Sequence, residues 1–390
     1  MAGEKAFWNG SEGELVIAVC QGCDREVKDG KGLCDACGQV AIRPLVPVAS
    51  VSVRAGLTPI IQSRIPELRG TWLKLESAGE TGSFKDRIMR VLVREAVESG
   101  SRLAVVASSG NAAISASSLC SRAGLGLVVV VPTTLSPVTL GLLSRFPILV
   151  IQYGAGPAES HALARELAKS LDAPNLSSTF SSSGAEFGCR TLGHEIAYQL
   201  PDVNIETISA SISVGPVLLG TRNGLLEAGK PRAVMVAGQA LGCSPIVRAF
   251  ETEAAAVVPW SEPVTTAAAS IADTLASYSE EATFFLGELR DSGGFMAAAD
   301  DDALAKIRRQ LREVDGVDVE LACCAAIYAL ILSGKAGALA TAVLTGSGQR
   351  ETLKNNESLE ANRHPGARTA TLLSGDITEA AREVLAWQKK

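Results

Sequence analysis

Residues 76–89, ESAGETGSFKDRIM, contain a lysine at a position where a cation is unfavourable. Ser83 and Asp86 have the spacing of a capping box, which predicts that a helix begins here, and apolar residues such as Ile88 continue it at helical spacing. Lys85 then lies in the first turn, at the positive end of the helix dipole. This setting favours the uncharged amine, the form in which a lysine attacks a carbonyl carbon and makes a Schiff base. The same stretch is compatible with a surface lysine that extends into water.

Short apolar segments alternate with helical segments on both sides of this stretch. The expected strands are TWLKLE (71–76), RLAVVA (102–107), GLVVVVP (126–132), ILVIQYG (148–154), IETISASIS (205–213) and RAVMVAG (232–238). Strands that alternate with helices indicate parallel sheets covered on both faces. The sequence therefore predicts an α/β protein with two open, mostly parallel twisted sheets covered by helices.

Polar or glycine-containing turns follow three of the expected strands, and ligands of open parallel sheets lie at the carboxyl ends of strands. Ser108, Ser109 and Asn111 could grip a carboxylate, although plain helix capping explains the same residues. The turn 214–220 contains two glycines before a helix and could hold a phosphate. The turn 345–348, TGSG, follows an apolar strand near the C-terminus.

Four of the nine cysteines form two C-x2-C motifs, called knuckles here: Cys20, Cys23, Cys34 and Cys37. Such knuckles let four thiolates converge on one zinc ion, and four cysteine ligands would make that zinc structural. The ten-residue loop between the pairs is shorter than usual. A knuckle without metal and a redox pair are the alternatives. The odd total argues against a disulfide framework, and the other cysteines fit small core residues.

Composition and motifs exclude several functions. The net charge is −6 and no basic tract is present, which argues against nucleic-acid binding. The apolar stretch 321–332 is too short to span a bilayer and fits a buried helix, and the N-terminus has no signal-peptide core, so we expect no membrane association and a cytoplasmic location. The dinucleotide fingerprint and the P-loop are both incomplete, and none of the three histidines lies in a recognisable catalytic motif.

Four motifs, in this order, carry a resemblance to a known family: ETGSFKDR, SSGN before a helix, GHEIAYQL, and TGSG after a late strand. Together they resemble the pyridoxal-phosphate enzymes of fold type II, most closely the threonine synthase group, over about 57–351. Some members of that group have an N-terminal cysteine-rich ribbon. We expect a zinc-ribbon-like segment at 1–47, a large cofactor domain formed by 48–84 and 181–390, and a smaller substrate-gripping domain at 85–180.

The resemblance implies roles for individual residues. Lys85 would form the Schiff base with pyridoxal phosphate and later move protons as the general acid and base. Asn111 would bond the 3′-oxygen of the cofactor, and Ser108 and Ser109 would hold the substrate carboxylate. Thr345, or Ser347 close by, would meet the pyridine nitrogen with a neutral hydroxyl. The family also suggests a homodimer.

Two departures from the family pattern affect the cofactor loop and the substrate. The phosphate loop of the family is glycine-rich, whereas Pro216 here removes one N–H donor, so the loop must use Gly215, Val217 and the Ser213 hydroxyl. After FKDR the family has glycine, and this chain has Ile88. A bulkier residue there could reshape the site near the substrate side chain.

Three functions follow from these observations. The first is a threonine synthase reaction, in which O-phosphohomoserine gives threonine and phosphate, with Ser83 and Arg87 as partners of the substrate phosphate. The second is β-replacement or β-elimination on phosphoserine, serine or threonine, as in a cysteate-synthase-like enzyme or a dehydratase. The third is a non-catalytic protein whose ribbon mediates contacts.

Overall fold

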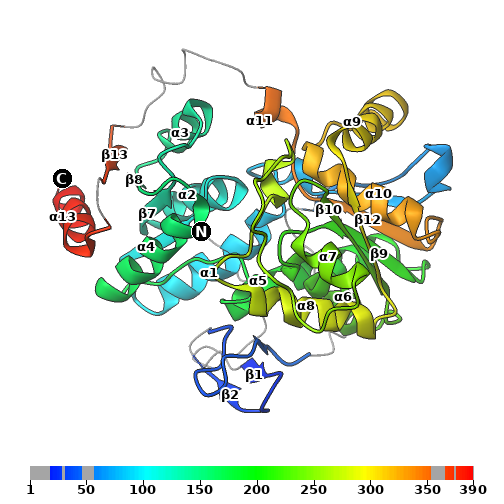
Figure 1. The fold of residues 1–390 in the computed structure, drawn as a ribbon, viewed down its shortest axis with the longest axis horizontal. Helices are drawn as coiled ribbons and strands as arrows, with labels where there is room; N and C mark the ends of the chain where they lie inside the picture. Colours follow the sequence, from blue (N-terminus) through cyan, green and yellow to red (C-terminus); the bar gives the residue numbers. More distant parts are fainter. Residues whose placement is uncertain (1–17, 29–30, 46–56, 353–364, 373–374, 390) are drawn as a thin grey trace. The chain divides into compact units, whose positions relative to one another are not determined.

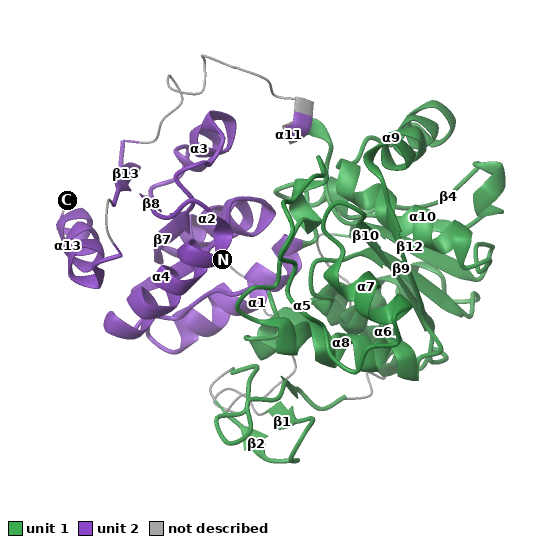
Figure 2. Ribbon diagram, viewed as in Figure 1, with its two compact units in different colours: residues 1–84, 179–350 green, residues 85–178, 351–390 purple. Residues whose placement is uncertain are grey.

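A computed structural model describes residues 18–28, 31–45, 57–352, 365–372 and 375–389 (Figure 1). The chain divides into two compact units, coloured separately in Figure 2. Unit 1 comprises Met1–Phe84 and Thr179–Arg350, and unit 2 comprises Lys85–Ser178 and Glu351–Lys390. None of the helices in the described part of the chain combines the length and apolarity needed to cross a bilayer.

Unit 1 is built on a six-stranded sheet. Its strands, in their order across the sheet, are β11 (Phe295–Ala299), β10 (Val234–Ala240), β9 (Thr207–Ser211), β12 (Ala340–Leu344), β5 (Trp72–Leu75) and β4 (Ile60–Gln62). β4 runs antiparallel to β5, and the other neighbours are parallel. Every residue of β9 and β12 is buried, as expected of central strands covered on both faces.

Helices cover this sheet. They are α5 (Ser183–Gln199), α6 (Pro216–Glu227), α7 (Pro245–Glu251), α8 (Ser279–Asp291), α9 (Asp301–Gln310) and α10 (Cys324–Leu332), and the short helix α11 (Gln349–Thr352) follows β12. α10 and α9 share one apolar core with the strands. The buried helix expected at 321–332 is confirmed as α10 and the 3₁₀ turn before it. α5 and α6 pack so closely that a Cβ on Gly224 would lie 1.9 Å from the Arg190 carbonyl oxygen.

The cysteine-rich segment of unit 1 forms its own small antiparallel sheet. Its strands are β1 (Ala18–Cys20), β2 (Glu26–Val27) and β3 (Ala41–Ile42), in the order β2-β1-β3. The small buried cluster of this segment includes two of the knuckle cysteines, Cys20 and Cys34. A buried cluster this small is typical of segments that a bound metal stabilises.

Unit 2 contains a four-stranded parallel sheet. Its strands, in order, are β13 (Arg368–Thr371), β8 (Leu149–Gln152), β7 (Gly126–Val131) and β6 (Leu103–Ala107). The helices of unit 2 are α1 (Lys85–Glu98), α2 (Asn111–Ala123), α3 (Pro137–Leu143), α4 (Pro157–Ser170) and α13 (Ile377–Gln388). The two sheets, which are parallel except for β4, and their helices confirm the predicted α/β class.

Residues 351–390 group with unit 2, whereas the predicted large domain extended over 181–390. β13 pairs in parallel with β8, and Ala380 and Val384 of α13 are buried in the apolar core of this unit. These contacts join residues that are more than 200 positions apart, so local patterns do not reveal them.

The helix predicted around Lys85 is present, but the predicted capping box is not. α1 begins at Lys85, and Ser83 pairs instead with Gly346 in an isolated antiparallel bridge. The Ser83 hydroxyl is buried and has no hydrogen-bond partner among the described residues. The extended bridge holds Ser83 away from the helix terminus, so its side chain does not cap α1.

Candidate active site

Lys85 is the first residue of α1, directly after the segment that follows β5. Its Nζ donates a hydrogen bond to the Ser178 hydroxyl at 2.8 Å, within unit 2. The helix N-terminus disfavours positive charge at this position, as the sequence predicted. Ser178 was not among the predicted site residues, although it belongs to a serine-rich run, SSTFSSS, that could have drawn attention to it.

A buried hydrogen bond ties the lysine helix to the next helix of unit 2. The Ser115 hydroxyl on α2 donates to the Asp86 carboxylate on α1 at 2.7 Å, and both side chains are buried. α2 begins at Asn111, immediately after the carboxyl end of β6 and its turn. The bond therefore fixes the start of α2 relative to the start of α1.

The turn after β6 places its serines differently. The Ser108 hydroxyl accepts a hydrogen bond from the Gly110 N–H at 3.2 Å and shapes the turn, whereas Ser109 is exposed. Neither serine caps α2 by a side-chain bond, since the residue before the helix is Gly110. Capping by the serines is therefore not what this turn provides, and both serines remain candidates for binding a ligand.

The turn after β9 in unit 1 has the form of an anion cradle. α6 begins at Pro216, and Gly215 before it has a φ of +127°, which L residues rarely adopt. A Cβ on Gly215 would lie 2.2 Å from the Phe285 ring, so only glycine fits. Pro216 occupies the first helical position, where the helix supplies no acceptor for an N–H in any case. The departure at Pro216 is therefore compatible with a helix N-terminus that still presents the Val217 N–H to a phosphate.

The turn after β12 is packed against its neighbours by neutral groups. Thr345 is 7% exposed, and its hydroxyl lies 3.3 Å from the Ser211 hydroxyl and 3.4 Å from the Cys323 sulfur. Burial, with a smaller contribution from Glu320, raises the pKa of the Cys323 thiol to about 12, so the thiol stays neutral. Thr345 was predicted as a site residue, but neither partner was, because the pairing of β9 with β12 brings Ser211 to it and the fold of the 3₁₀ turn before α10 brings Cys323.

Residues 82–84, directly before Lys85, pair with the TGSG motif within unit 1. The Phe84 N–H donates to the Thr345 carbonyl oxygen at 3.0 Å, and the Ser347 N–H donates to the Gly82 carbonyl oxygen at 2.8 Å. With the bridge between Ser83 and Gly346, these bonds form a short extended pairing. The residue before Lys85 is thus held by the turn that follows β12.

The four knuckle cysteines converge. Their sulfur atoms all lie within 4.8 Å of one another, with separations of 3.4 Å for Cys20 and Cys37 and 3.7 Å for Cys23 and Cys34. Zinc–sulfur bonds of ~2.3 Å in a tetrahedron require sulfur separations of about 3.8 Å. Backbone N–H groups of Ala36 and then Cys37 lower the pKa of Cys34 to about 7. At Cys37 the Gln39 backbone lowers the pKa, but the Cys20 sulfur, burial and the other two thiols together raise it to about 12. The donor set therefore fits a structural zinc ion.

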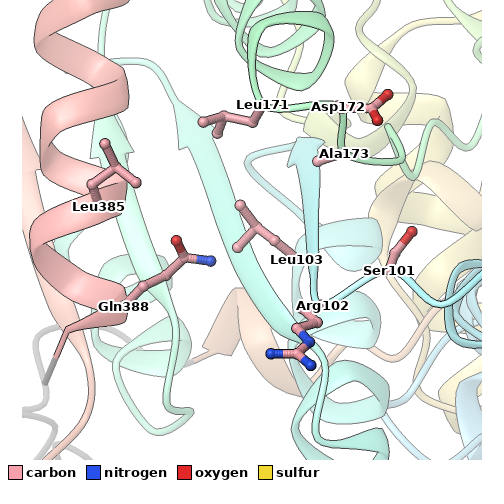
Figure 3. Close-up of a pocket in the computed structure, with 8 residues that line it drawn as sticks. All are labelled: Ser101, Arg102, Leu103, Leu171, Asp172, Ala173, Leu385 and Gln388. Atoms are coloured by element: carbon pink, nitrogen blue, oxygen red, sulfur yellow. The ribbon is translucent and has the colours of Figure 1, made fainter.

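A pocket of about 270 Å³ in unit 2 is a different kind of site (Figure 3). It lies beside Arg102 and Leu103, at the amino end of β6, and Leu385 of α13 lines its other side. Ligands of parallel sheets bind at the carboxyl ends of strands. The pocket is therefore not part of the candidate active site.

The fold and these turns define a class of protein: an enzyme of fold type II, built to hold pyridoxal phosphate on parallel α/β sheets. The model of the family "Pyridoxal-phosphate dependent enzyme" matches residues 51–348, and the chain therefore belongs to that family. The match includes the lysine motif, the turn after β9 and the turn after β12.

Curated relatives specify the group within the family. The threonine synthase of Methanosarcina acetivorans is 30% identical over 301 residues, which cover 73% of this chain and 72% of that protein. The threonine synthase of Halalkalibacterium halodurans is 29% identical over 334 residues, covering 82% and 85%. This chain is a threonine-synthase-like, pyridoxal-phosphate-dependent enzyme.

Solved structures agree on the fold. A threonine deaminase from Solanum lycopersicum has a TM-score of 0.64 at 17% identity, covering 78% of this chain and 82% of that chain. Maize serine racemase has a TM-score of 0.64 at 17% identity, covering 85% and 94%. At these identities the likeness shows the fold alone.

Proposed function

We propose that this chain converts O-phosphohomoserine and water into threonine and phosphate. Phosphate leaves from Cγ of the substrate, and water adds at Cβ. The observation that supports this substrate is the identity with curated threonine synthases over more than two thirds of the chain. The family match also spans every proposed cofactor and substrate residue from Ser83 to Ser347.

The residues present fit the cofactor, and each has a distinct role in the proposal. When bound, pyridoxal phosphate withdraws electrons from the substrate Cα and makes the Cα proton acidic. Lys85 would hold the cofactor covalently through Nζ, and its amine, when free, would move the proton at the substrate Cα. In this reaction a lysine replaces histidine as the acid and base, which agrees with the scarcity of histidine.

The remaining proposed contacts bind and orient. The N–H groups of Gly215 and Val217 and the Ser213 hydroxyl bind the cofactor phosphate at the start of α6. Thr345, with Ser347 as the alternative, meets the pyridine nitrogen, and the neutral groups around Thr345 leave that nitrogen unprotonated. Asn111 bonds the 3′-oxygen of the cofactor. Ser108 and Ser109 bind the substrate carboxylate.

The substrate phosphate provides the test. Ser83 and Arg87 are its proposed partners, and a guanidinium that binds phosphate through charge-assisted hydrogen bonds contributes strongly. Arg87→Ala should lower kcat/KM for O-phosphohomoserine by roughly 10- to 100-fold and leave unphosphorylated serine or threonine unaffected. Arg94→Ala is the matched control, since Arg94 lies on the same helix and pairs with Glu98 at the surface.

A second function is favoured by Ile88, which is fully buried where the family has glycine. The larger Ile88 side chain would leave less room near the substrate side chain. That favours a shorter substrate, for β-replacement or β-elimination on phosphoserine, serine or threonine. Turnover of serine or threonine that exceeds turnover of O-phosphohomoserine, and that Arg87→Ala leaves unchanged, would replace the first proposal by this one.

A further inference from the structure

The cysteine ribbon, residues 18–28 and 31–45, is joined to the body of unit 1 by backbone pairing. The Gly32 N–H donates to the Ser181 carbonyl oxygen at 3.0 Å, and Lys31 forms an antiparallel bridge with Ser182. A Cβ on Gly32 would lie 1.8 Å from the Phe180 carbonyl oxygen, so the close approach requires glycine. The segment 179–183 therefore pairs with the edge of the ribbon.

A buried ion network fixes the ribbon where its chain leaves β3. Arg190 of α5 is 1% exposed and is held by Glu186 and Glu227. Its guanidinium donates to the backbone carbonyl oxygens of Arg43, at 2.5 Å, and Pro44, at 3.0 Å. Displacing a buried, paired arginine costs free energy. These bonds therefore hold the ribbon in one position on α5.

The same segment is held from the other side by α8. Glu281 is buried on α8, and the Thr179 side chain and the Phe180 and Ser181 backbone lie close enough to act on its pKa. The Phe180 ring is buried and packs edge-on against Phe284 at a centroid distance of 5.3 Å. Residues 179–181 thus lie between the ribbon and α8, in contact with both.

Ser178, whose hydroxyl accepts the hydrogen bond from Lys85 Nζ, immediately precedes this segment. The other end of the connection is Cys34, which is two residues from Gly32 and belongs to the converging thiol cluster. We infer that a metal ion in the ribbon fixes segment 179–183 and thereby makes Ser178 a positioning residue for the Lys85 amine. The inference rests on the proposed role of Lys85, and it gives the ribbon a regulatory function in catalysis.

Metal removal and one substitution test this coupling. Gly32→Ala separates the ribbon edge from Phe180 while leaving all four thiols in place, and Gly287→Ala is the control, because a Cβ there meets open space. Amide hydrogen exchange is measured on cofactor-free protein, with zinc content determined alongside. Zinc removal by a chelator, and Gly32→Ala with zinc retained, should each speed exchange at 179–183 about tenfold, and Gly287→Ala should not.

Ser178→Ala tests the second step. With zinc bound and exchange at 179–183 unchanged, this variant should shift the pH at which the visible absorbance of the bound cofactor changes, and zinc removal should shift it in the same direction. Unchanged exchange after zinc removal, or an unchanged absorbance titration in Ser178→Ala, would overturn the inference. Because exchange is measured without cofactor, an unchanged exchange rate at 179–183 counts only against the coupling through the ribbon. The absence of a visible cofactor band counts against the proposed function.

Discussion

Gly215 is the residue at which the cofactor loop tolerates least change. Alanine there would face both a positive φ and the Phe285 ring. We expect Gly215→Ala to lower the free energy of unfolding by about 2–4 kcal/mol, from strain and overpacking together, and to weaken pyridoxal phosphate binding. Thermal unfolding and a cofactor titration measure the two effects. Gly287→Ala on α8, which has open space for a Cβ, should change neither.

Residue identities predicted some of this site and not the rest. The position of Lys85 at a helix start could be predicted from its flanking residues, since helix signals are local. The contacts of Ser211 and Cys323 to Thr345 could not be predicted, because the first depends on which strands become neighbours and the second on how the turn before α10 packs. The capping role expected of Ser83 failed for the same reason: a long-range bridge to Gly346 prevails over the local motif.

At the scale of elements, α1 and α2 are coupled by one buried bond. Ser115→Ala removes the donor to the Asp86 carboxylate and should cost about 1–3 kcal/mol of stability. Ser117→Ala is the control on the same helix: the Ser117 hydroxyl donates to the Ala113 carbonyl oxygen of its own helix, and its loss should cost less than about 1 kcal/mol. Equal losses for both variants in chemical denaturation would contradict a specific coupling.

The link between α8 and segment 179–181 should depend on pH. Burial raises the pKa of Glu281 to about 7, from an ordinary 4.5. Between these two pH values the folded state holds a proton that the unfolded state has lost. The free energy of unfolding should therefore be highest below pH 4.5 and fall by roughly 3 kcal/mol as the pH rises toward 7. Glu281→Gln should remove this decline. Parallel slopes of unfolding free energy against pH in both proteins would show that Glu281 titrates normally.

Most elements follow from local patterns, but their assembly does not. Alternating apolar and helical segments predicted the strands from β5 to β10, and the structure confirms them, whereas β4 was not predicted. β13 was not predicted, because it is short and partly exposed and is defined as a strand only by its pairing with β8. The assignment of 351–390 to the large domain failed with it.

For the whole molecule, the α/β class and the family could be predicted from the sequence, since periodicity and an intact lysine motif are both local signals. The docking of the ribbon on segment 179–183 could not, because it requires a glycine to meet a carbonyl oxygen far away in the chain. A homodimer and a cytoplasmic location stay predictions.

The central claim is that Lys85 carries pyridoxal phosphate. The most direct test is the visible absorbance of the purified protein, with added cofactor, before and after borohydride reduction, followed by peptide mapping. The account predicts a visible band that reduction abolishes and an adduct on Lys85. Lys74 is the internal control, since its Nζ is buried against Glu195 at 2.8 Å and should stay unmodified. No band with added cofactor, or an adduct on any other lysine, would contradict the account.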